Sequence, residues 1–502
     1  MATTELEYLK FPKYRRAFIK LGNFFAALPR GVVGIIFAIG RFFRGLGTTV
    51  ADIFKDIVLT WKNGDWKTRV SYFVFGFGNI ARGQILRGVL FLVFELAFIV
   101  FMILLGGPNL VRLGTLGTVK PGYDPETGIT VEGDNSFTIL LYGVMSIFFI
   151  VAFLYTWFAN VKQNKIAQEI MATGKPLKSG KQDLQSLVDD QFHKTLLALP
   201  LLGIVIFTVL PIFFMILIAF TEYDSHHFPP GDLFTWVGFR NFQSIFDLGA
   251  SGNFASTFGE ILLWTLVWAF FATFTNYFIG MVVAMLINRK GIKLKKFWRT
   301  VLVVSIAIPQ FISLLYVGRM FAKDGLINTL LISWGWVDPL HPLPFWEDIW
   351  WSRITVILVN IWVGIPYLML ITTGILMNIP ADLYESAKID GASPWKMYIK
   401  ITLPYMLFVT GPYLLSSFIG NMNNFNVIYL LNGGAPQLGT GDLDGVAGHT
   451  DLLITWLYKL TVDQKNYKMA SVIGIMVFLL SAFISVIIYN IIPSMKNEED
   501  FQ

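Results

Sequence analysis

The chain has 502 residues, of which 55% are hydrophobic and 14% charged, with a formal net charge of +6 and a mean hydropathy of +0.60. Soluble domains carry about 25% charged residues, so this composition excludes an ordinary soluble protein and indicates a chain that crosses a membrane several times. Cysteine is absent and the five histidines are scattered, which excludes disulfides and leaves no pattern for a metal site.

The first 84 residues mix apolar and basic side chains. Their apolar run, residues 31–40, is too short to span a bilayer. Basic amphipathic helices lie on the inner face of a membrane, so we expect residues 1–84 to form a cytoplasmic or interfacial region. A partly disordered tail is the alternative for the first ten residues. The basic residues within 11–60 include Lys13, Arg15, Arg16, Lys20, Arg30, Arg41 and Arg44.

Later stretches have the roughly 20 apolar residues that a membrane span needs. Eight are predicted, at residues 85–106, 137–158, 195–220, 258–287, 299–321, 353–377, 405–430 and 469–492. Lys and Arg concentrate in alternate connections, such as residues 159–194 and 288–298. Positively charged connections stay in the cytoplasm, so both termini and residues 378–404 are expected there. The predicted fold class is an all-α polytopic membrane protein with eight transmembrane helices.

The sixth predicted span combines polar, aromatic and helix-breaking residues. Pro366 removes a backbone donor and Gly364 exposes the backbone, so we expect the helix to be interrupted there. Interrupted helices near the bilayer midplane form substrate sites in transporters, and Asn360 adds a polar side chain to this one. Tyr367 can stack on a sugar ring, whereas Trp362 can equally face lipid or the protein core.

A polar segment, residues 380–404, follows this span. Pro380 suits a helix N-terminus, and Gly391 can adopt the left-handed conformation that ends a helix. Ser393-Pro394 then predicts the start of a second short helix, which we expect Pro404 to end.

The seventh span holds a cluster of uncharged polar residues. Ser417, Asn421 and Asn424 are spaced i, i+4 and i+7, which places them on one face of a continuous helix. Their hydroxyl and carboxamide groups suit a neutral polyhydroxyl solute. The alternative is interhelical hydrogen bonding, the role expected of Asn423 and Asn426.

The sequence contains no motif for an energy source. The phosphate-binding pattern Gly-x-x-x-x-Gly-Lys-Ser/Thr does not occur, and no catalytic motif is recognisable, so no catalytic residue, metal or enzyme activity is expected. Energy must come from partner subunits or from an ion gradient. An ion-driven carrier needs buried acids, and only Glu95 lies well inside a predicted span. Hydrogen-bonded packing is its expected role, with a proton relay as the alternative.

Residues 384–404 carry a resemblance. Glu385-Ser386-Ala387, Asp390-Gly391-Ala392 and Ile401-x-Leu403-Pro404 resemble the EAA loop of ABC-importer permeases, with Ser386 at a position where Ala is usual. In that family the loop docks on an ATPase subunit. The resemblance implies ATPase coupling through Glu385, Ser386, Ala387, Asp390 and Gly391, and an ordinary cytoplasmic hairpin is the alternative.

From about residue 195 onward the chain resembles the larger permease subunit of maltose/maltodextrin ABC importers. The resemblance implies a type I ABC-importer core and a sugar site at Gly364, Tyr367, Ser417, Asn421 and Asn424. It rests on the coupling loop and on Val237-Gly238-Phe239-Arg240-Asn241-Phe242, Asn423-Asn424-Phe425, Leu431-Asn432-Gly433-Gly434-Ala435-Pro436 and His449-Thr450-Asp451-Leu452-Leu453.

Two departures from the enterobacterial form matter. Gly420 stands where that form has an aromatic residue that packs on the sugar, which implies a wider pocket. The loop 221–257 lacks a large folded insert. Together with the basic N-terminal region, this pattern suggests the cytoplasmic membrane of a Gram-positive bacterium.

The function predicted from the resemblance is one permease subunit of an ATP-driven maltose/maltodextrin importer. The implied partners are a second permease subunit, two ATPase subunits that bind ATP and magnesium, an extracellular sugar-binding protein and membrane lipid, with no nucleic acid and no cofactor in this chain. The rivals are a permease for another oligosaccharide and an ion-driven secondary transporter. The predicted regions are 1–84, the accessory spans 85–194, a six-helix core 195–496 with coupling loop 380–404, and an acidic tail 497–502.

Overall fold

The structure is a computed structural model that describes residues 40–41, 44–45, 51–124, 128–247, 254–289, 291–438 and 446–491. The predicted acidic tail 497–502 and the basic residues before position 40 lie outside these described residues. The predicted all-α polytopic fold is confirmed, because seven described helices are long and apolar enough to cross a membrane and a bent helix pair makes up to eight. The seven stretches are Ile85–Arg112, Ser136–Ala172, Phe192–Ile218, Phe254–Asn288, Ile349–Leu376, Pro394–Asn432 and Tyr467–Ile488.

The chain divides into two compact units. One comprises Met1–Leu110 and Tyr142–Ile204, and the other comprises Val111–Leu141 and Val205–Gln502. The predicted region boundaries after residues 84, 194 and 496 stay predictions.

The first unit is held together by a buried polar network between the segment before α5 and the long helix α7. Arg82 donates hydrogen bonds to Asn164 Oδ1 at 2.9 Å and to Asp65 Oδ1 at 2.5 Å, and Asn160 Nδ2 donates to Ser71 O at 2.7 Å. Satisfied buried networks of this kind fix one arrangement of the chain. The helices of this unit are 51–63, α3 (Trp66–Val70), α4 (Phe77–Ile80), α5 (Ile85–Phe101), a π-helical turn (Met102–Gly106), α7 (Ser136–Ala172, from residue 142), α8 (Gly180–Val188) and α9 (Phe192–Ile204), while α6 (Gly107–Arg112) crosses the unit boundary.

Glu95 on α5 is 7% exposed and accepts a hydrogen bond from the backbone N–H of Phe75 at 2.8 Å. The carboxylate therefore satisfies a buried backbone donor, which supports the packing role predicted for it over a proton relay.

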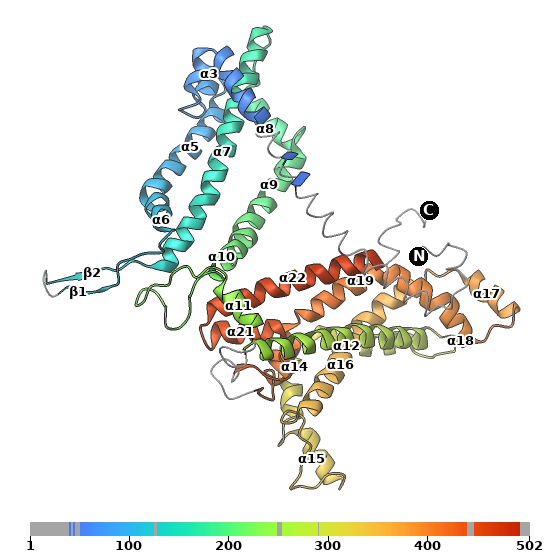
Figure 1. Ribbon diagram of the computed structural model, residues 1–502. Coiled ribbons are helices and arrows are strands. Elements are labelled where there is room, and N and C mark those ends of the chain that lie inside the picture. Colours follow the sequence, from blue (N-terminus) through green and yellow to red (C-terminus); the bar gives the residue numbers. More distant parts are fainter. Residues whose placement is uncertain are drawn as a thin grey trace, which may run out of the picture. The chain divides into compact units, whose positions relative to one another are not determined.

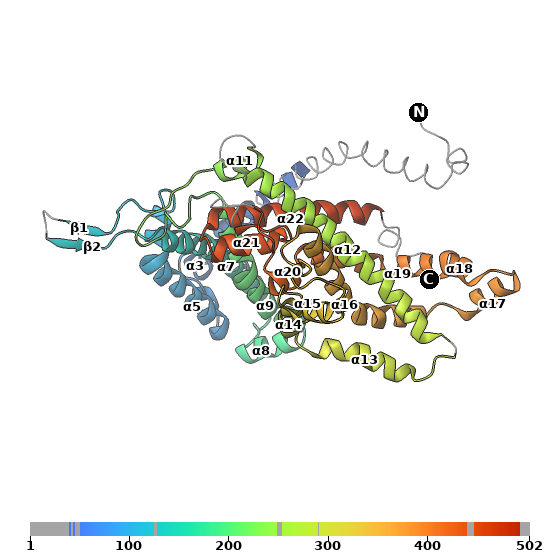
Figure 2. The same cartoon turned by 90° about the horizontal axis from the view of Figure 1, so that it is seen from below.

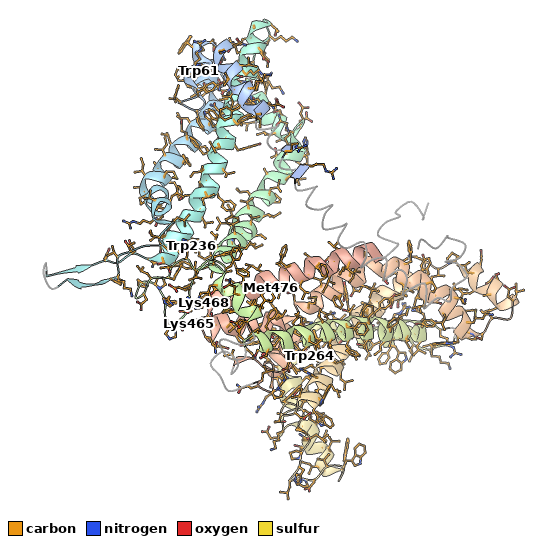
Figure 3. The ribbon with its side chains drawn as sticks, in the orientation of Figure 1. Trp61, Trp236, Trp264, Lys465, Lys468 and Met476 are labelled. Carbon is orange, nitrogen blue, oxygen red and sulfur yellow. The ribbon has the colours of Figure 1, made fainter. Side chains whose placement is uncertain are left out.

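The second unit is built around α12, which packs along α16 and α19 (Figures 1 and 2). Trp264 and Trp268 of α12 share a hydrophobic core with Val356 and Val359 of α16. A second core joins Trp456 of α21 to residues of α22, with Met476 packed against it; Figure 3 labels Trp264 and Met476.

The elements of the second unit follow in chain order. They are β1 (Gly122–Asp124) and β2 (Ile129–Val131), which pair antiparallel, a π-helical turn (Val205–Val209), α10 (Leu210–Ile218), α11 (Arg240–Phe246), α12 (Phe254–Asn288), α13 (Lys295–Ala307), α14 (Gln310–Met320), α15 (Leu326–Ser333), α16 (Ile349–Leu376), α17 (Ala381–Ile389), α18 (Pro394–Met397), a π-helical turn (Tyr398–Thr402), α19 (Leu403–Met422), α20 (Phe425–Asn432), α21 (Leu453–Val462) and α22 (Tyr467–Ile491).

The fifth predicted span is broken, which the single stretch 299–321 did not anticipate. Helices α13 and α14 meet at an angle of 92°. Ile308, between them, is extended with φ −83° and ψ 127°. A residue before proline is driven out of the helical region by the proline ring, so Pro309 explains the break.

The interruption predicted at Gly364 and Pro366 is wrong. Helix α16 runs unbroken from Ile349 to Leu376 with Pro366 inside it. Membrane helices tolerate proline where neighbouring helices support the backbone, and Pro366 and the following Leu368 and Met369 are buried in the bundle.

The seventh predicted span also departs from one straight helix. Helix α19 ends at Met422 and α20 begins at Phe425, with Asn424 as its N-cap. The Asn424 side chain accepts a hydrogen bond from the N–H of Val427 at 3.2 Å. Asn424 therefore lies in the short break between the helices, and the continuous i, i+4, i+7 face predicted for Ser417, Asn421 and Asn424 does not exist as such.

Candidate functional site

Two buried carboxamides lie in the α12–α16 region. A Cβ added at Gly364 of α16 would lie 2.3 Å from Asn276 Nδ2 of α12, so a larger residue does not fit there unless Asn276 moves. Asn276 and Asn360 are 6% and 4% exposed, and within the described residues Asn276 Oδ1 and Asn360 Nδ2 have no hydrogen-bond partner. The sequence reasoning missed Asn276, although an amide in the middle of a predicted apolar span was an available signal.

The aromatic residues of the predicted site are accessible. Trp362 is 48% exposed and Tyr367 is 53% exposed. Both line a cavity of about 340 Å³ between α16 and the α13–α14 break, together with Gln310 and Ser313. The predicted site residues of α16 therefore separate into two sets, because Asn360 is buried while Trp362 and Tyr367 face this cavity.

Ser417 and Tyr413 lie on α19, both partly buried. Gly420, one turn beyond Ser416, is exposed, and a Cβ there would meet nothing within 4 Å. The wider pocket expected from Gly420 stays a prediction.

Asn421 makes the interhelical contacts of this cluster. Its Nδ2 donates to Thr273 Oγ1 of α12 at 3.0 Å, and its backbone carbonyl accepts from Trp268 Nε1 at 3.1 Å. Asn424 Nδ2 reaches Asn421 Oδ1 at 3.4 Å. The structural role predicted for Asn423 is wrong, since Asn423 is exposed and donates to Ile419 O within its own helix.

The segment 380–404 has the predicted helix ends. Gly391 adopts φ +72°, and its N–H donates to Lys388 O while the N–H of Ala392 donates to Ala387 O, which is a Schellman motif. Ser393 caps α18 by accepting a hydrogen bond from the N–H of Lys396 at 3.3 Å. Both local predictions are therefore confirmed.

The expectation that Pro404 ends the second short helix is wrong. From α18 the helix continues through the π-helical turn Tyr398–Thr402 into α19. Pro404 directly follows the π-helical turn, and the helix continues through it as α19. The π-helical turn therefore joins the polar segment directly to a candidate span.

The exposed surface of this segment carries both charged and large apolar side chains. Glu385, Ser386 and Asp390 are all exposed, and Ile389 and Trp395 are 87% and 69% exposed. Large apolar side chains that stand beside charged ones on a short loop are typical of a surface that binds another protein.

Comparison with known sequences shows the family of this chain. Residues 276–497 match the model of the binding-protein-dependent transport system inner membrane component family. The maltodextrin transport system permease protein MalC of Streptococcus pneumoniae is 33% identical over 432 residues, which are 84% of this chain and 95% of MalC. The chain belongs to this family.

Other relatives differ in the cargo that their names state. The galactooligosaccharides transport system permease protein GanP of Bacillus subtilis is 34% identical over 82% of this chain and 92% of GanP. The maltose/maltodextrin transport system permease protein MalF of Escherichia coli is 33% identical over 55% of this chain and 52% of MalF. This inner membrane component is thus a multi-pass permease of the bacterial inner membrane and not an ATPase subunit.

Two family-like segments of this permease, 431–436 and 449–453, meet in space. Gln437 and Gly448 form an antiparallel bridge, and a Cβ at Gly434 would lie 2.2 Å from Asp451 Oδ1. Asp451 is fully buried and accepts hydrogen bonds from Lys459 Nζ at 2.5 Å and from the N–H of Gly448 at 2.7 Å. Spacing along the sequence could not show that Asp451 and Lys459 hold this junction together.

Glu260 contacts two side chains beside the same junction. Glu260 of α12 lies 2.6 Å from His449 Nδ1 and 3.3 Å from Arg353 Nη2, and Arg353 stacks over the ring of Trp264 at 4.7 Å. These contacts join α12, α16 and the 449–453 segment to one another.

Proposed function

We propose that this permease carries neutral oligosaccharides of the maltodextrin class. The observation that supports this cargo is the accessible pair Trp362 and Tyr367, which lines a cavity without a single charged side chain. Aromatic faces and uncharged donors and acceptors bind sugar rings and hydroxyl groups, whereas an anionic or cationic cargo needs opposite charges. The names of MalC and MalF favour maltodextrins, and that of GanP favours galactooligosaccharides as the second candidate.

The proposed substrate residues are Gly364, Tyr367, Ser417, Asn421 and Asn424, with Asn360 and Trp362 beside them. In this proposal the chain forms half of the pathway and a second permease subunit forms the other half. An extracellular sugar-binding protein delivers the cargo. The exposure of Trp362, Tyr367 and Gly420 agrees with a site that is completed by another chain.

In this proposal two ATPase subunits, which bind ATP and magnesium, supply the energy for transport and dock on α17. Glu385, Ser386, Ala387, Asp390 and Gly391 are the proposed coupling residues. The exposed Glu385, Ser386, Asp390 and Gly391, together with the apolar side chains of Ile389 and Trp395, provide a surface for this contact. An ion-driven transporter, the rival mechanism, leaves that surface without a partner.

The cargo is tested with the complete importer in proteoliposomes that contain ATP. We expect uptake of maltotriose, and we expect Tyr367→Ala to reduce it about tenfold or more because a stacking face and a hydroxyl are lost. Tyr155→Ala is the matched control, since Tyr155 is 77% exposed on α7. Uptake of a galactooligosaccharide instead of maltotriose would select the second candidate.

Coupling is tested at Gly391. A β-branched residue is strained at φ +72°, so Gly391→Val should distort the end of α17 and separate ATP hydrolysis from sugar uptake. Gly335→Val is the control, because Gly335 has φ +71° and equally open surroundings in a different loop. Full uptake with Gly391→Val, or uptake by the isolated chain without ATPase subunits, would contradict the coupling proposal.

A further inference from the structure

The connection between α12 and α13 carries a concentration of positive charge. Residues 261–323 contain no Asp or Glu, and the described cations between the end of α12 and the second turn of α13 form what we call the basic cluster. Its members are Arg289, Lys293, Lys295, Lys296 and Arg299. The connection directly follows a candidate span, and positively charged connections stay on the cytoplasmic side. The basic cluster is therefore expected at the level of the lipid headgroups of the inner leaflet.

Uncharged partners hold part of the basic cluster on the helix bundle. Lys295 Nζ donates to Asn288 O at 3.0 Å, and Arg299 Nη2 donates to Asn288 Oδ1. Asn288 Nδ2 in turn donates to Thr373 Oγ1 of α16 at 3.2 Å. Among the described residues no acid pairs with any member of the cluster, and the buried Arg299 Nε has no hydrogen-bond partner. The cluster therefore has a fixed attachment but no negative charge to balance it.

The first turns of α13 also expose aromatic side chains. Leu302 and Val303 pack against residues of α12 and α16, so one side of α13 faces the bundle. Phe297 and Trp298 are instead 54% and 50% exposed. Cations beside exposed Phe and Trp on one helix are typical of a surface that binds an anionic membrane, because the rings enter the boundary between headgroups and acyl chains.

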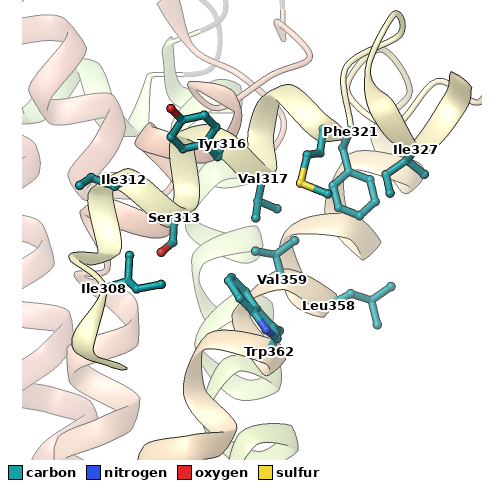
Figure 4. A pocket seen from close by; sticks show the side chains of 11 residues that line it. Ile308, Ile312, Ser313, Tyr316, Val317, Phe321, Ile327, Leu358, Val359 and Trp362 are labelled. Atoms are coloured by element: carbon teal, nitrogen blue, oxygen red, sulfur yellow. The ribbon is translucent and has the colours of Figure 1, made fainter. Parts of the chain in front are cut away.

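The opposite end of α13 has a different character. The cavity of about 660 Å³ that begins at Ile308 is lined without a charged side chain (Figure 4). All the charged residues of α13 thus lie in its first two turns, next to α12. This distribution is expected of a helix that meets the lipid headgroups at one end only.

The basic cluster adjoins the segment that carries the proposed ATPase contact. Asn288 and Arg289 line a cavity of about 510 Å³ together with Tyr384 of α17 and Tyr398 and Thr402 of the following π-helical turn. A ligand at the cluster therefore lies beside the packing that joins α17 to the bundle.

We infer that the basic cluster binds anionic phospholipids of the cytoplasmic leaflet. Lipid phosphates pair with the exposed Arg289, Lys293 and Lys296, and Phe297 and Trp298 enter the apolar boundary below them. An acidic protein surface offers the same charge, but a membrane offers the charge and the apolar boundary together. The inference does not depend on the cargo of the permease.

The test measures which lipid lies next to the cluster in the complete importer. A fluorophore is attached to Thr300→Cys, an exposed position one turn beyond Lys296, in a chain that has no other cysteine and with cysteine-free partner subunits. Proteoliposomes of phosphatidylcholine receive a small fraction of spin-labelled phosphatidylglycerol or spin-labelled phosphatidylcholine. Each cation near an anionic surface strengthens binding roughly fivefold, so phosphatidylglycerol should quench at about a tenfold lower fraction than phosphatidylcholine.

The charge is then removed from two exposed lysines. Lys293→Gln with Lys296→Gln should lower the preference for phosphatidylglycerol about fivefold or more, whereas Lys293→Arg with Lys296→Arg should retain it. The matched control is Lys175→Gln with Lys181→Gln, which removes the same charge from exposed positions between α7 and α8 and should leave the preference unchanged.

Salt provides a second measurement that needs no variant. Raising the salt from about 0.05 M to about 0.5 M should reduce the preference of the unmodified importer, because exposed charges are screened. Equal quenching by both lipids, or an equal preference in the Lys→Gln variant, would overturn the inference. Absence of quenching by either lipid would also overturn it, because a protein subunit would then cover the cluster.

Discussion

At the scale of single residues, the contact between Gly364 and Asn276 shows why a glycine stands in the middle of α16. A methyl group at Gly364 would lie 2.3 Å from the Asn276 amide, which is buried and cannot turn into solvent. Gly364→Ala should therefore lower the free energy of unfolding by about 1–3 kcal/mol, the usual effect of overpacking. Thermal and denaturant unfolding of the purified permease in detergent measure this.

The same helix provides the control for this prediction. Gly374 also lies in α16, and a Cβ there meets nothing within 4 Å. Gly374→Ala should be neutral or stabilise by about 0.5–1 kcal/mol, because alanine loses less backbone entropy in a helix. The pair Gly364→Ala with Asn276→Ala should recover part of the lost stability, and destabilisation that persists in full would show that another contact is responsible.

A pH-dependent contribution to stability comes from Asp224, in the loop after α10. Burial alone would raise the pKa of Asp224, but hydrogen bonds from Lys468 and His227 lower it to about 2. Because the folded-state pKa is below the ordinary value of 3.8, the contribution is complete above about pH 4 and is lost as the pH falls towards 2. Its size above pH 4 is about 2 kcal/mol.

Asp224→Asn should remove this contribution. We expect the variant to unfold more easily at pH 6 and to show a flatter stability profile between pH 4 and 2 than the unmodified permease. The exposed Asp338, whose carboxylate lies 3.3 Å from His341 Nδ1 and accepts a hydrogen bond from the N–H of Leu340, is the control position for an Asp→Asn change. Parallel profiles for Asp224→Asn and the unmodified permease would contradict the assignment.

Local and non-local residues differ in how far the sequence predicts them. The Gly391 turn and the Ser393 cap were predictable, because a helix end is determined by the few residues that form it. Asn276 was not, because its importance depends on Gly364 facing it from another helix. The exposed Trp362 and the buried Asn360 are two residues apart, and only the packing of α16 separates them.

At the scale of elements, hydropathy predicted where the spans are but not where they bend. Pro309 breaks a span and Pro366 does not. Ile308 and Pro309 are exposed, so the extended conformation before the proline meets no obstacle. Pro366 is buried among residues of α16 that pack on neighbouring helices, and these contacts keep the helix intact. Both positions are proline, so the surroundings of each proline decide whether the helix breaks.

One hydrogen bond links α17 to the π-helical turn before α19. Tyr384 Oη lies 2.9 Å from Thr402 Oγ1, and Thr402 is buried. Because α17 carries the proposed ATPase contact and α19 carries Ser417 and Asn421, this bond lies on the direct route between them. Tyr384→Phe and Thr402→Val should each reduce sugar uptake per ATP hydrolysed about two- to fivefold, since a modest hydrogen bond is lost.

A double-mutant cycle isolates that bond. The double variant should be no worse than either single variant, because both remove the same interaction. Tyr405→Phe is the control, since no hydrogen bond of the Tyr405 hydroxyl occurs among the described residues. Additive losses in the double variant would show that Tyr384 and Thr402 act separately.

At the scale of the whole molecule, the distribution of charge predicts which loops share a side of the membrane. The absence of cysteine makes this directly testable, because a single introduced cysteine has no background. Lys388 is exposed on α17, and His341 is exposed in the loop after α15 with a side chain 83% accessible. Positive-inside orientation places Lys388 in the cytoplasm and His341 outside.

A membrane-impermeant maleimide should therefore label His341→Cys in intact cells, and Lys388→Cys only after the membrane is opened. The ATPase subunits proposed to dock on α17 should in addition protect Lys388→Cys in the assembled importer, because the exposed Ile389 and Trp395 beside it would then be covered. If this protection disappears when the ATPase subunits are removed, the experiment supports both the cytoplasmic position of α17 and its contact with the ATPase subunits. Labelling of Lys388→Cys from outside intact cells would place α17 on the wrong side of the membrane for any cytoplasmic ATPase, and the proposed coupling would then have no physical basis.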